Sequence, residues 1–432
     1  MLDRLPVKEP GIYSLTGGRQ VGKTTLLKQW MAELLKTGIA PERIAYVTGE
    51  MIDDHDALVR LVSEHLRDSA RGTQYLCLDE VTYIREWDRG IKFLADAGVL
   101  KDLVLLLSGS DSVVIQEARA RLPGRRGRAD VVDFHLYPLT FHEYVALKRA
   151  FDASEIDRIG NREREVERRL IRRLFDAFGT YLLHGGYLTA INDFEREQSI
   201  RRATLATYSD WIRGDVLKRG KNEKYLAEVL GAVVKRYGSQ ITWNALSKDL
   251  SIDHPATIAD YVELLSRMDV LIVQAALRED RLSGAPKKAR KVAFSDPFIL
   301  HAVRCWLDPT EDPFREQMQP LLADLEWAGK LAEACAACHY ARFFPTYYLK
   351  GENEVDIAYI RGKKLWPVEI KWSGQIRPKD LKQVSRYPNA LICTRSEASG
   401  EINGVPTEPL PLTLFRLGPS PVTSLTLQGR AL

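Results

Sequence analysis

The chain has 432 residues, more than the roughly 250–300 at which a single hydrophobic core stops growing, so we expect at least two domains. Its 45% hydrophobic and 28% charged residues are ordinary for a soluble globular protein. A net charge of +4 excludes a uniformly basic chain, so any nucleic-acid surface must be a local patch. The chain has five cysteines, an odd count that indicates reduced thiols, and its start lacks the apolar core of a signal peptide. It also has no run of about 18 apolar residues. We therefore expect a cytoplasmic protein without a membrane partner.

The first 150 residues alternate between short apolar runs and helical stretches. We expect strands at 12–15, 44–47, 75–78 and 103–107, and a helix at 23–36. Short apolar runs separated by helices are typical of a parallel sheet that carries helices on both faces. The sequence therefore predicts an α/β domain at the N-terminus.

A phosphate-binding motif lies between the first strand and the first helix. The G-x-x-x-x-G-K-[ST] pattern is matched in full, and glycines there let backbone N–H groups approach phosphates closely. The amino end of the helix adds partial positive charge. Lys23 should reach the β- and γ-phosphates of ATP, and the Thr24 hydroxyl should ligate Mg²⁺. The residues expected to bind nucleotide are Gly17, Gly18, Arg19, Gln20, Val21, Gly22, Lys23, Thr24 and Thr25.

Two carboxylates end the third strand. Asp79 stands where a carboxylate meets Mg²⁺, directly or through water, and Glu80 is placed to orient or deprotonate the attacking water. The alternative is an acidic strand end without a catalytic role. An adjacent Asp-Glu pair after an apolar strand favours hydrolysis over binding alone.

Two further candidates follow in the N-terminal part. The fourth strand ends in Ser108-Gly109-Ser110-Asp111, where a hydroxyl, with Ser110 as the candidate, could sense the γ-phosphate or hold the lytic water, the alternative being an ordinary turn. Arg125 lies in the arginine-rich segment RARLPGRRGR, and we expect it to act as an arginine finger on a neighbouring subunit. A solvated basic loop is the competing interpretation. A finger acting in trans would require a homo-oligomer.

The middle of the chain changes character after residue 150. Residues 151–219 carry dense charge of both signs and little strand character, which predicts a helical lid. In residues 220–296, helices at 245–250 and 255–268 precede a strand near 271–274, a basic stretch and another strand. A helix-turn-helix with a two-stranded wing is the simplest interpretation.

This middle segment gives mixed evidence for DNA binding. The expected recognition helix carries Asp260 and Glu263 with only Arg267 as a base, which disfavours reading of base edges. The expected wing is basic and could lie on a phosphate backbone, or it could be a solvated hairpin. Its bases are Arg281, Lys287, Lys288, Arg290 and Lys291.

The C-terminal part carries a second possible reaction centre. Strand candidates at 355–360 and 365–370, joined by a short turn, place Asp356 beside Glu369 and Lys371, and alternation puts the last two on one face. Two carboxylates can hold Mg²⁺, and a lysine can activate water. Glu333, in an apolar helical run, needs a partner such as a metal or Lys371. Gln383 begins a Q-x-x-x-Y pattern on an expected helix.

Several segments together resemble one family. They are GGRQVGKTT, LDEVTYIREWDRGIKFLAD, SGSD and YPLTFHEYV, followed by GTYLLHGGYLTAI, DYVELLSRMDVLIV, KVAFSDPFI and EVDIAYI. Their order is similar to that in a large prokaryotic family of AAA-type ATPases with a C-terminal domain of unknown function. The resemblance covers nearly the whole chain. It implies an AAA-type P-loop core, a winged-helix-like middle and a C-terminal α/β domain similar to the PD-(D/E)XK, or restriction-endonuclease-like, nucleases.

These observations predict an ATPase coupled to a metal-dependent DNA nuclease. The expected domains are an ATPase core at 1–150, a lid at 151–219, a winged-helix-like domain at 220–296 and a nuclease-like domain at 297–432. ATP and Mg²⁺ are the expected cofactors, and DNA bound by structure or without specificity is the expected partner. The main alternative is a nucleotide-gated switch or scaffold whose C-terminal domain does not cut. A sequence-specific transcription regulator is a further alternative, which the acidic recognition helix disfavours.

Overall fold

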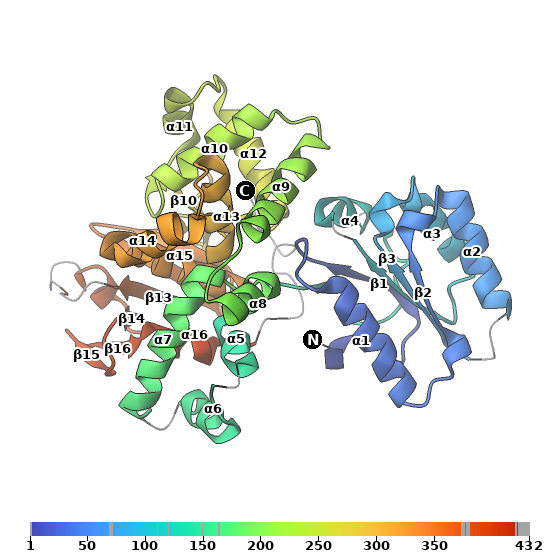
Figure 1. The fold of residues 1–432 in the computed structure, drawn as a ribbon, viewed down its shortest axis with the longest axis horizontal. Coiled ribbons are helices and arrows are strands. Elements are labelled where there is room, and N and C mark those ends of the chain that lie inside the picture. The colour runs from blue at the N-terminus through green and yellow to red at the C-terminus, as the bar shows by residue number, and fades with distance from the viewer. Residues whose placement is uncertain are drawn as a thin grey trace. The chain divides into compact units, whose positions relative to one another are not determined.

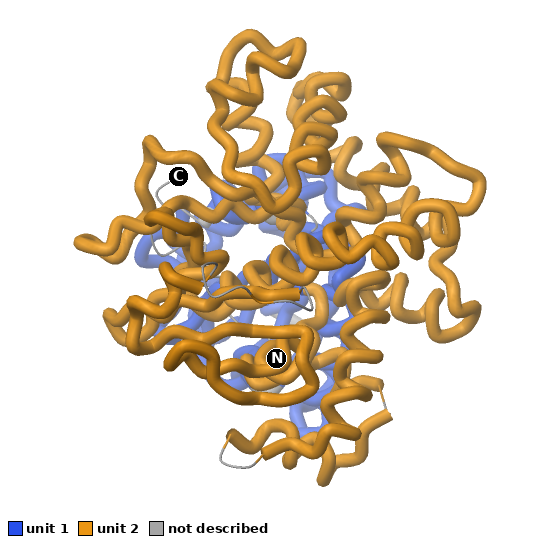
Figure 2. Tube along the Cα trace, turned by 90° about the vertical axis from the view of Figure 1, so that its left-hand side faces the viewer, with its two compact units in different colours: residues 1–137, 422–424 blue, residues 138–421, 425–432 orange. Residues whose placement is uncertain are grey.

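The computed structural model divides the chain into two compact units. One unit comprises residues 1–137 and the other begins at Pro138 and continues to Pro421 (Figure 2). No helix among the described residues is both long enough and apolar enough to cross a bilayer. The structure describes residues 2–68, 72–109, 111–119, 121–148, 150–162, 165–372, 376, 381–419 and 421.

A five-stranded parallel sheet forms the centre of the N-terminal unit (Figure 1). Its strand order is β2-β3-β4-β1-β5, and the first four strands confirm the predicted ones. The three-residue β5 was not predicted. The strands are β1 (Gly11–Thr16), β2 (Ile44–Thr48), β3 (Gln74–Asp79), β4 (Leu103–Ser108) and β5 (Asp133–His135).

Helices cover both faces of this sheet. The apolar stripe of α1 (Lys23–Lys36) packs with Tyr13 and Val104 on one face. The other face is covered by α2 (His55–Asp68), α3 (Trp87–Asp96) and α4 (Ser112–Arg119). Strands β1, β3 and β4 are buried along their whole length, which explains their mainly apolar sequences, whereas β2 is partly exposed. The predicted helix 23–36 is confirmed.

Strand order determines which side chains meet at the carboxyl edge of the sheet. β4 lies between β1 and β3, so the ends of these three strands are neighbours. Ligands of open parallel sheets bind outside this edge. The phosphate-binding loop follows β1, Asp79 ends β3 and Ser108 ends β4.

The second unit begins with helices. The predicted helical character of 151–219 is confirmed, and α7 and α9 both pack on α13 (Pro297–Leu307). The helix that precedes the expected lid belongs to this unit and not to the unit of the five-stranded sheet. The helices are α5 (Phe141–Leu147), α6 (Ala153–Gly160), α7 (Arg168–His184), α8 (Leu188–Glu197) and α9 (Arg202–Leu217).

The next segment combines three helices with a small sheet. Strand β10 (Arg290–Phe294) lies between β6 (Gln240–Ile241) and β7 (Leu271–Ala275) and is antiparallel to both. The helices are α10 (Glu223–Lys235), α11 (Trp243–Asp249) and α12 (Pro255–Arg267), and the strands β8 (Leu277–Arg278) and β9 (Ser283–Gly284) form a separate pair. The predicted helices and the strand near 271 are confirmed.

A six-stranded mixed sheet forms the C-terminal part. The hairpin of β12 and β13 confirms the predicted pair of strands, and β14 continues parallel to β13. Before the sheet come a π-helix (Phe314–Met318), α14 (Gln319–Ala323) and α15 (Leu325–Phe343), and α16 (Leu410–Leu417) follows it. In spatial order the strands are β11 (Thr346–Lys350), β12 (Glu354–Arg361), β13 (Lys364–Lys371), β14 (Leu391–Thr394), β16 (Val405–Pro409) and β15 (Gly400–Ile402).

The small sheet and the C-terminal sheet share a core. A β-bridge joins Ala276 to Tyr348, and the Tyr348 hydroxyl donates to the carbonyl oxygen of Ala289 at 2.6 Å. Leu277 packs with Leu349 and with buried residues of β12. Residues 220–296 are therefore fixed on the first strand of the C-terminal sheet.

Candidate functional site

The phosphate-binding loop has a backbone that requires glycine at two places. Gly17 has φ 144°, and a Cβ atom there would collide with the carbonyl oxygen of Leu136. Gly22 has φ 103° and caps the amino end of α1 in the left-handed region. The loop therefore turns tightly from β1 into the first turn of α1, whose backbone N–H groups are available to an anion.

Lys23 begins α1 and is almost fully buried, with 6% of its surface exposed. Its ammonium donates hydrogen bonds to the carbonyl oxygens of Gly17 at 3.0 Å and Gly18 at 2.8 Å. The two glycines thus hold the cation against the loop. A nucleotide phosphate in this loop would meet a positioned positive charge.

Asp79 is the centre of a hydrogen-bond network. Its carboxylate accepts from Thr24 Oγ1 at 2.7 Å, Tyr46 Oη at 2.8 Å, the Glu80 backbone N–H at 3.0 Å and the Ser108 hydroxyl. Burial raises the pKa of Asp79, but the hydrogen bonds outweigh burial, so the pKa is lowered overall. The side chain is therefore an ionised, oriented carboxylate at neutral pH.

The same geometry fits a magnesium site. Thr24 Oγ1 and Asp79 Oδ2 lie 2.7 Å apart, although their residues are far apart in sequence. Hydroxyl and carboxylate oxygens are the ligands that Mg²⁺ prefers. Thr24 and Asp79 are the side chains that could hold the ion, directly or through water.

Glu80 directly follows β3 and is partly exposed. Its backbone is left-handed, with φ 52° and ψ 40°, which is uncommon for a residue other than glycine. A Cβ atom at Gly49 would collide with the Glu80 carbonyl oxygen, so the end of β2 supports this conformation. Such local strain is typical of residues that are held in place for function.

Two hydrogen bonds to Asp79 were not predicted from the sequence. Ser110, the predicted sensor, lies outside the described residues, whereas Ser108 is buried and bonded to Asp79. Tyr46 also reaches Asp79. The position of each hydroxyl in the sequence could have indicated these bonds. A hydroxyl that is buried at a strand end or within an apolar strand needs a hydrogen-bond partner.

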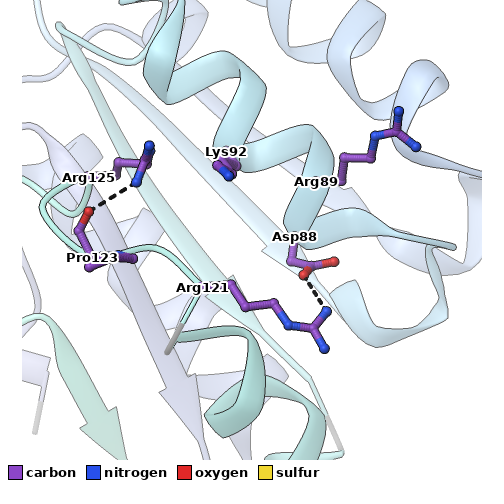
Figure 3. Close-up of a pocket in the computed structure, with 6 residues that line it drawn as sticks. All are labelled: Asp88, Arg89, Lys92, Arg121, Pro123 and Arg125. Carbon is purple, nitrogen blue, oxygen red and sulfur yellow. Dashed lines mark hydrogen bonds and ion pairs between the residues drawn. The ribbon is translucent and has the colours of Figure 1, made fainter.

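Arg125, the predicted finger, lies at an open pocket of about 450 Å³ that includes Asp88, Arg121 and Pro123 (Figure 3). Its guanidinium pairs with Asp96 of α3 through distances of 2.5 and 3.3 Å. A role in trans would require this intramolecular pair to open. The finger assignment stays a prediction.

The C-terminal sheet brings the predicted nuclease-like residues together. Asp356 of β12 accepts the Ile370 backbone N–H at 2.8 Å, and its own N–H lies 3.4 Å from Glu369 Oε2. Lys371 Nζ lies 2.6 Å from Glu369 Oε1. Two carboxylates and a lysine therefore share one region of the hairpin.

Glu333 has a different partner from the one expected. Its Oε1 lies 2.5 Å from Nζ of Lys291, a residue of β10. Lys291 also pairs with Glu354, and its ammonium lies 3.5 Å from Asp356 Oδ1. Carboxylate oxygens of Glu333, Glu354 and Asp356 lie within 4.8 Å of one another, a separation that could hold a metal ion. Glu354 and Lys291 were not predicted at this site.

The crowding of acids has an electrostatic consequence. Burial, with the neighbouring Asp356 adding to it, raises the pKa of Glu369 to about 8 and that of Glu333 to about 7. Burial lowers the pKa of Lys291, but the surrounding carboxylates outweigh it and raise the pKa overall. The carboxyl groups of this cluster therefore outnumber its cations, and an additional cation would be attracted to it.

The basic wing expected at 281–291 is only partly a surface feature. Lys291 is 4% exposed and faces the acidic cluster, and Arg290 lies over the Trp243 ring at 4.5 Å. The expectation that Lys291 reaches a phosphate backbone is therefore wrong for this structure, because its side chain is buried among carboxylates. Arg290 is partly exposed, and its contact with phosphate stays a prediction. Arg281, Lys287 and Lys288 remain exposed.

The Q-x-x-x-Y segment does not form the expected helix. Only a short 3₁₀ turn, Val384–Arg386, follows Gln383. Gln383 is buried, its Nε2 lies 3.4 Å from the Tyr387 hydroxyl, and its Oε1 accepts from Arg386. Its side chain also packs against Gly351, between β11 and β12, where an added Cβ atom would lie 2.6 Å from it.

The sheet, the loop and the Asp79 network define the N-terminal unit as a P-loop ATPase-like domain. Residues 9–145 match the family model described as AAA domain. Residues 175–310 match a domain of unknown function (DUF8612). Both models end before the acidic cluster is complete, so the nuclease-like assignment of 297–432 stays a prediction.

Similar proteins were found by sequence and by structure. An uncharacterized protein of Haemophilus influenzae is 23% identical over 266 residues, covering 59% of this chain and 60% of that protein. One of Methanocaldococcus jannaschii is 29% identical over 140 residues, covering 31% and 28%. The aligned segments thus span less than two thirds of either relative.

Among solved structures, the Walker-type ATPase PABY2304 of Pyrococcus abyssi has a TM-score of 0.41 at 13% identity, covering 68% of this chain and 91% of that one. The Aeropyrum pernix Orc1 protein in complex with DNA has a TM-score of 0.30 at 13% identity, covering 71% and 88%. Similarities of this size carry no argument about what the chain binds.

Proposed function

We propose that the chain binds ATP with Mg²⁺ and hydrolyses it at the carboxyl edge of the five-stranded sheet. The observation that carries this proposal is the Asp79 network, in which an ionised carboxylate is joined to Thr24 of the phosphate-binding loop at 2.7 Å. Three hydroxyls, from α1, β2 and β4, converge on this one carboxylate, and one of them is the Thr24 hydroxyl that the loop motif predicts as a Mg²⁺ ligand.

Each residue has a defined task in this proposal. Lys23 and the N–H groups of the loop bind the phosphates, while Asp79 and Thr24 hold the ion. Bound Mg²⁺ would neutralise charge on the phosphate oxygens. Glu80 orients the attacking water and accepts its proton, because it is the partly exposed carboxylate next to Asp79.

The test compares nucleotide binding with turnover. Glu80→Gln should bind ATP with native affinity and lose turnover by about 10²–10⁴-fold, the usual contribution of a general base. Lys23→Ala should lose ATP binding. Glu33→Gln and Lys36→Ala, which change exposed residues of α1, are the matched controls. Native turnover in Glu80→Gln would refute its catalytic role, and native affinity in Lys23→Ala would refute the phosphate site.

The second proposed activity is metal-dependent cleavage of DNA at the C-terminal sheet, coupled to ATP turnover. It is supported by the proximity of Asp356, Glu369 and Lys371 and by the raised pKa of Glu369. Asp356 and Glu333, together with Glu354 of the acidic cluster and Glu369 of the hairpin, would hold a divalent cation, which would supply charge neutralisation and an activated water. Lys371 would stabilise charge on the phosphate. The competing proposal is a nucleotide-gated scaffold that binds DNA or a protein without cutting.

Cleavage assays separate these two proposals. Labelled linear, single-stranded and branched DNA would be incubated with Mg²⁺ or Mn²⁺, with and without ATP. Lys371→Ala should abolish cleavage and keep ATPase activity, whereas Lys364→Ala at the exposed start of β13 should change neither. If cleavage survives in both Lys371→Ala and Asp356→Ala, the nuclease activity belongs to another site. No cleavage of any DNA, with ATPase intact, would favour the scaffold.

The winged-helix-like arrangement of residues 220–296, contact with DNA and assembly into a homo-oligomer also remain proposals. Helices α11 and α12 with the sheet β6-β10-β7 support the first. Exposed Arg281, Lys287 and Lys288 support non-specific phosphate contact.

A further inference from the structure

Lys291 joins two parts of the second unit that the sequence separates by many residues. It lies on β10 of the small sheet, and its ammonium is among Glu333 of α15 and Glu354 and Asp356 of β12. Its side chain is 5% exposed. Gln240 of β6 also contacts Glu354, so the small sheet provides a second polar group to this cluster.

We propose that Lys291 is an internal cation that occupies the place of a divalent metal ion and thereby keeps the C-terminal site in a metal-free, inactive state. This inference rests on the proposed metal-dependent activity. It adds a regulatory contact: the ammonium must leave the three carboxylates before an ion can use their oxygens.

Geometry makes the two cations compete. A divalent ion binds carboxylate oxygens at about 2.0–2.6 Å. Lys291 Nζ already lies 2.5 Å from Glu333 Oε1 and 3.5 Å from Asp356 Oδ1. An ion on the same oxygens would lie within a few ångströms of the ammonium, where like charges in a partly dehydrated site repel strongly.

A contribution to fold stability is a weak explanation for a buried lysine at position 291. A buried ion pair seldom stabilises a fold more than apolar residues of similar volume would. Here three carboxylates face one ammonium, so the lysine does not balance the charge around it. A divalent ion would neutralise the cluster better.

The first experiment measures Mn²⁺ binding to the full chain by titration calorimetry without nucleotide. Lys291→Met should lower the Mn²⁺ dissociation constant by at least about tenfold, because a unit positive charge is removed from the site. Adding Glu354→Gln to that variant should reverse the gain. Lys288→Met, an exposed lysine near the start of the same strand, should bind Mn²⁺ as the native chain does. Native Mn²⁺ affinity in a folded Lys291→Met chain would overturn the proposal.

The second experiment uses the native chain and does not depend on the folding of a variant. Lysines would be acetylated briefly with and without Mn²⁺ and quantified by mass spectrometry. Lys291 should be protected without the ion and become reactive with it, while exposed Lys287 and Lys288 react equally in both conditions. If Lys291 stays protected from acetylation at saturating Mn²⁺, the proposal that the ion displaces its ammonium is refuted.

The two proposals fail in different ways. Tighter Mn²⁺ binding by Lys291→Met without DNA cleavage would support the internal cation and refute the nuclease. Metal-dependent cleavage by the native chain, with unchanged Mn²⁺ binding in Lys291→Met, would support the nuclease and refute the internal cation.

Discussion

Replacing Tyr46 with phenylalanine isolates one hydrogen bond of the Asp79 network. The substitution removes only the hydroxyl that donates to Asp79 Oδ2 at 2.8 Å. A hydrogen bond to a charged acceptor contributes about 1.5–3 kcal/mol, and three other donors remain, so we expect a loss near 1.5 kcal/mol. For a unit of 137 residues this lowers the melting temperature by about 5 °C.

The matched control is Tyr75→Phe in the same sheet. The Tyr75 hydroxyl donates to the neutral carbonyl oxygen of Val7 at 2.6 Å, so its removal should cost less, about 1 kcal/mol. The assay is calorimetric melting of the full chain between pH 7 and pH 3, following the transition of the N-terminal unit.

The pH dependence distinguishes the two variants. The pKa of Asp79 is lowered in the folded state, so its stabilisation is present above the unfolded pKa of about 3.9 and is lost as the pH falls through the folded value. The loss of unfolding free energy in Tyr46→Phe, relative to the native chain, should therefore shrink below about pH 4, while the loss in Tyr75→Phe stays constant. Equal, pH-independent deficits would refute an ionised Asp79 held by Tyr46.

Three further predictions concern other positions. Gly49→Ala should displace the Glu80 carbonyl and lower ATP turnover by about tenfold to a hundredfold at unchanged ATP affinity, and equal turnover would show that this contact does not position Glu80. Mixing Arg125→Ala with Glu80→Gln chains should restore part of the ATPase activity that each lacks alone, and no recovery would count against a finger in trans. Burial raises the pKa of Asp296 to about 6, so the melting temperature of the second unit should fall as the pH rises from about 4 to about 6. Asp296→Asn should remove this pH dependence. If the dependence persists in the variant, it belongs to another group.

The N-terminal site could largely be predicted from the sequence because its residues follow strand ends in a regular α/β pattern. Gly22, Lys23 and Asp79 lie where the motif and strand pattern place them. Ser108 and Tyr46 could not be assigned, because their contacts depend on the order of the strands, and β4 lies beside β3 only in the folded sheet.

The C-terminal site was predicted less completely for a similar reason. Asp356, Glu369 and Lys371 belong to one hairpin, and local alternation is enough to bring them together. Lys291 comes from a strand far away in sequence, in a run of bases that is usually solvated. Its burial depends on the packing of β10 beside β12, which local patterns do not contain.

The bridge between Ala276 and Tyr348 bears on how the chain can be divided. A cut near residue 310, where the second family match ends, would separate Leu277 from Leu349 and leave Tyr348 without the Ala289 carbonyl. Each fragment would then present apolar surface to water. Protein engineering should therefore exchange residues 138–421 as one piece, because α7 and α9 also pack on α13 and the end of the second family match falls inside this unit.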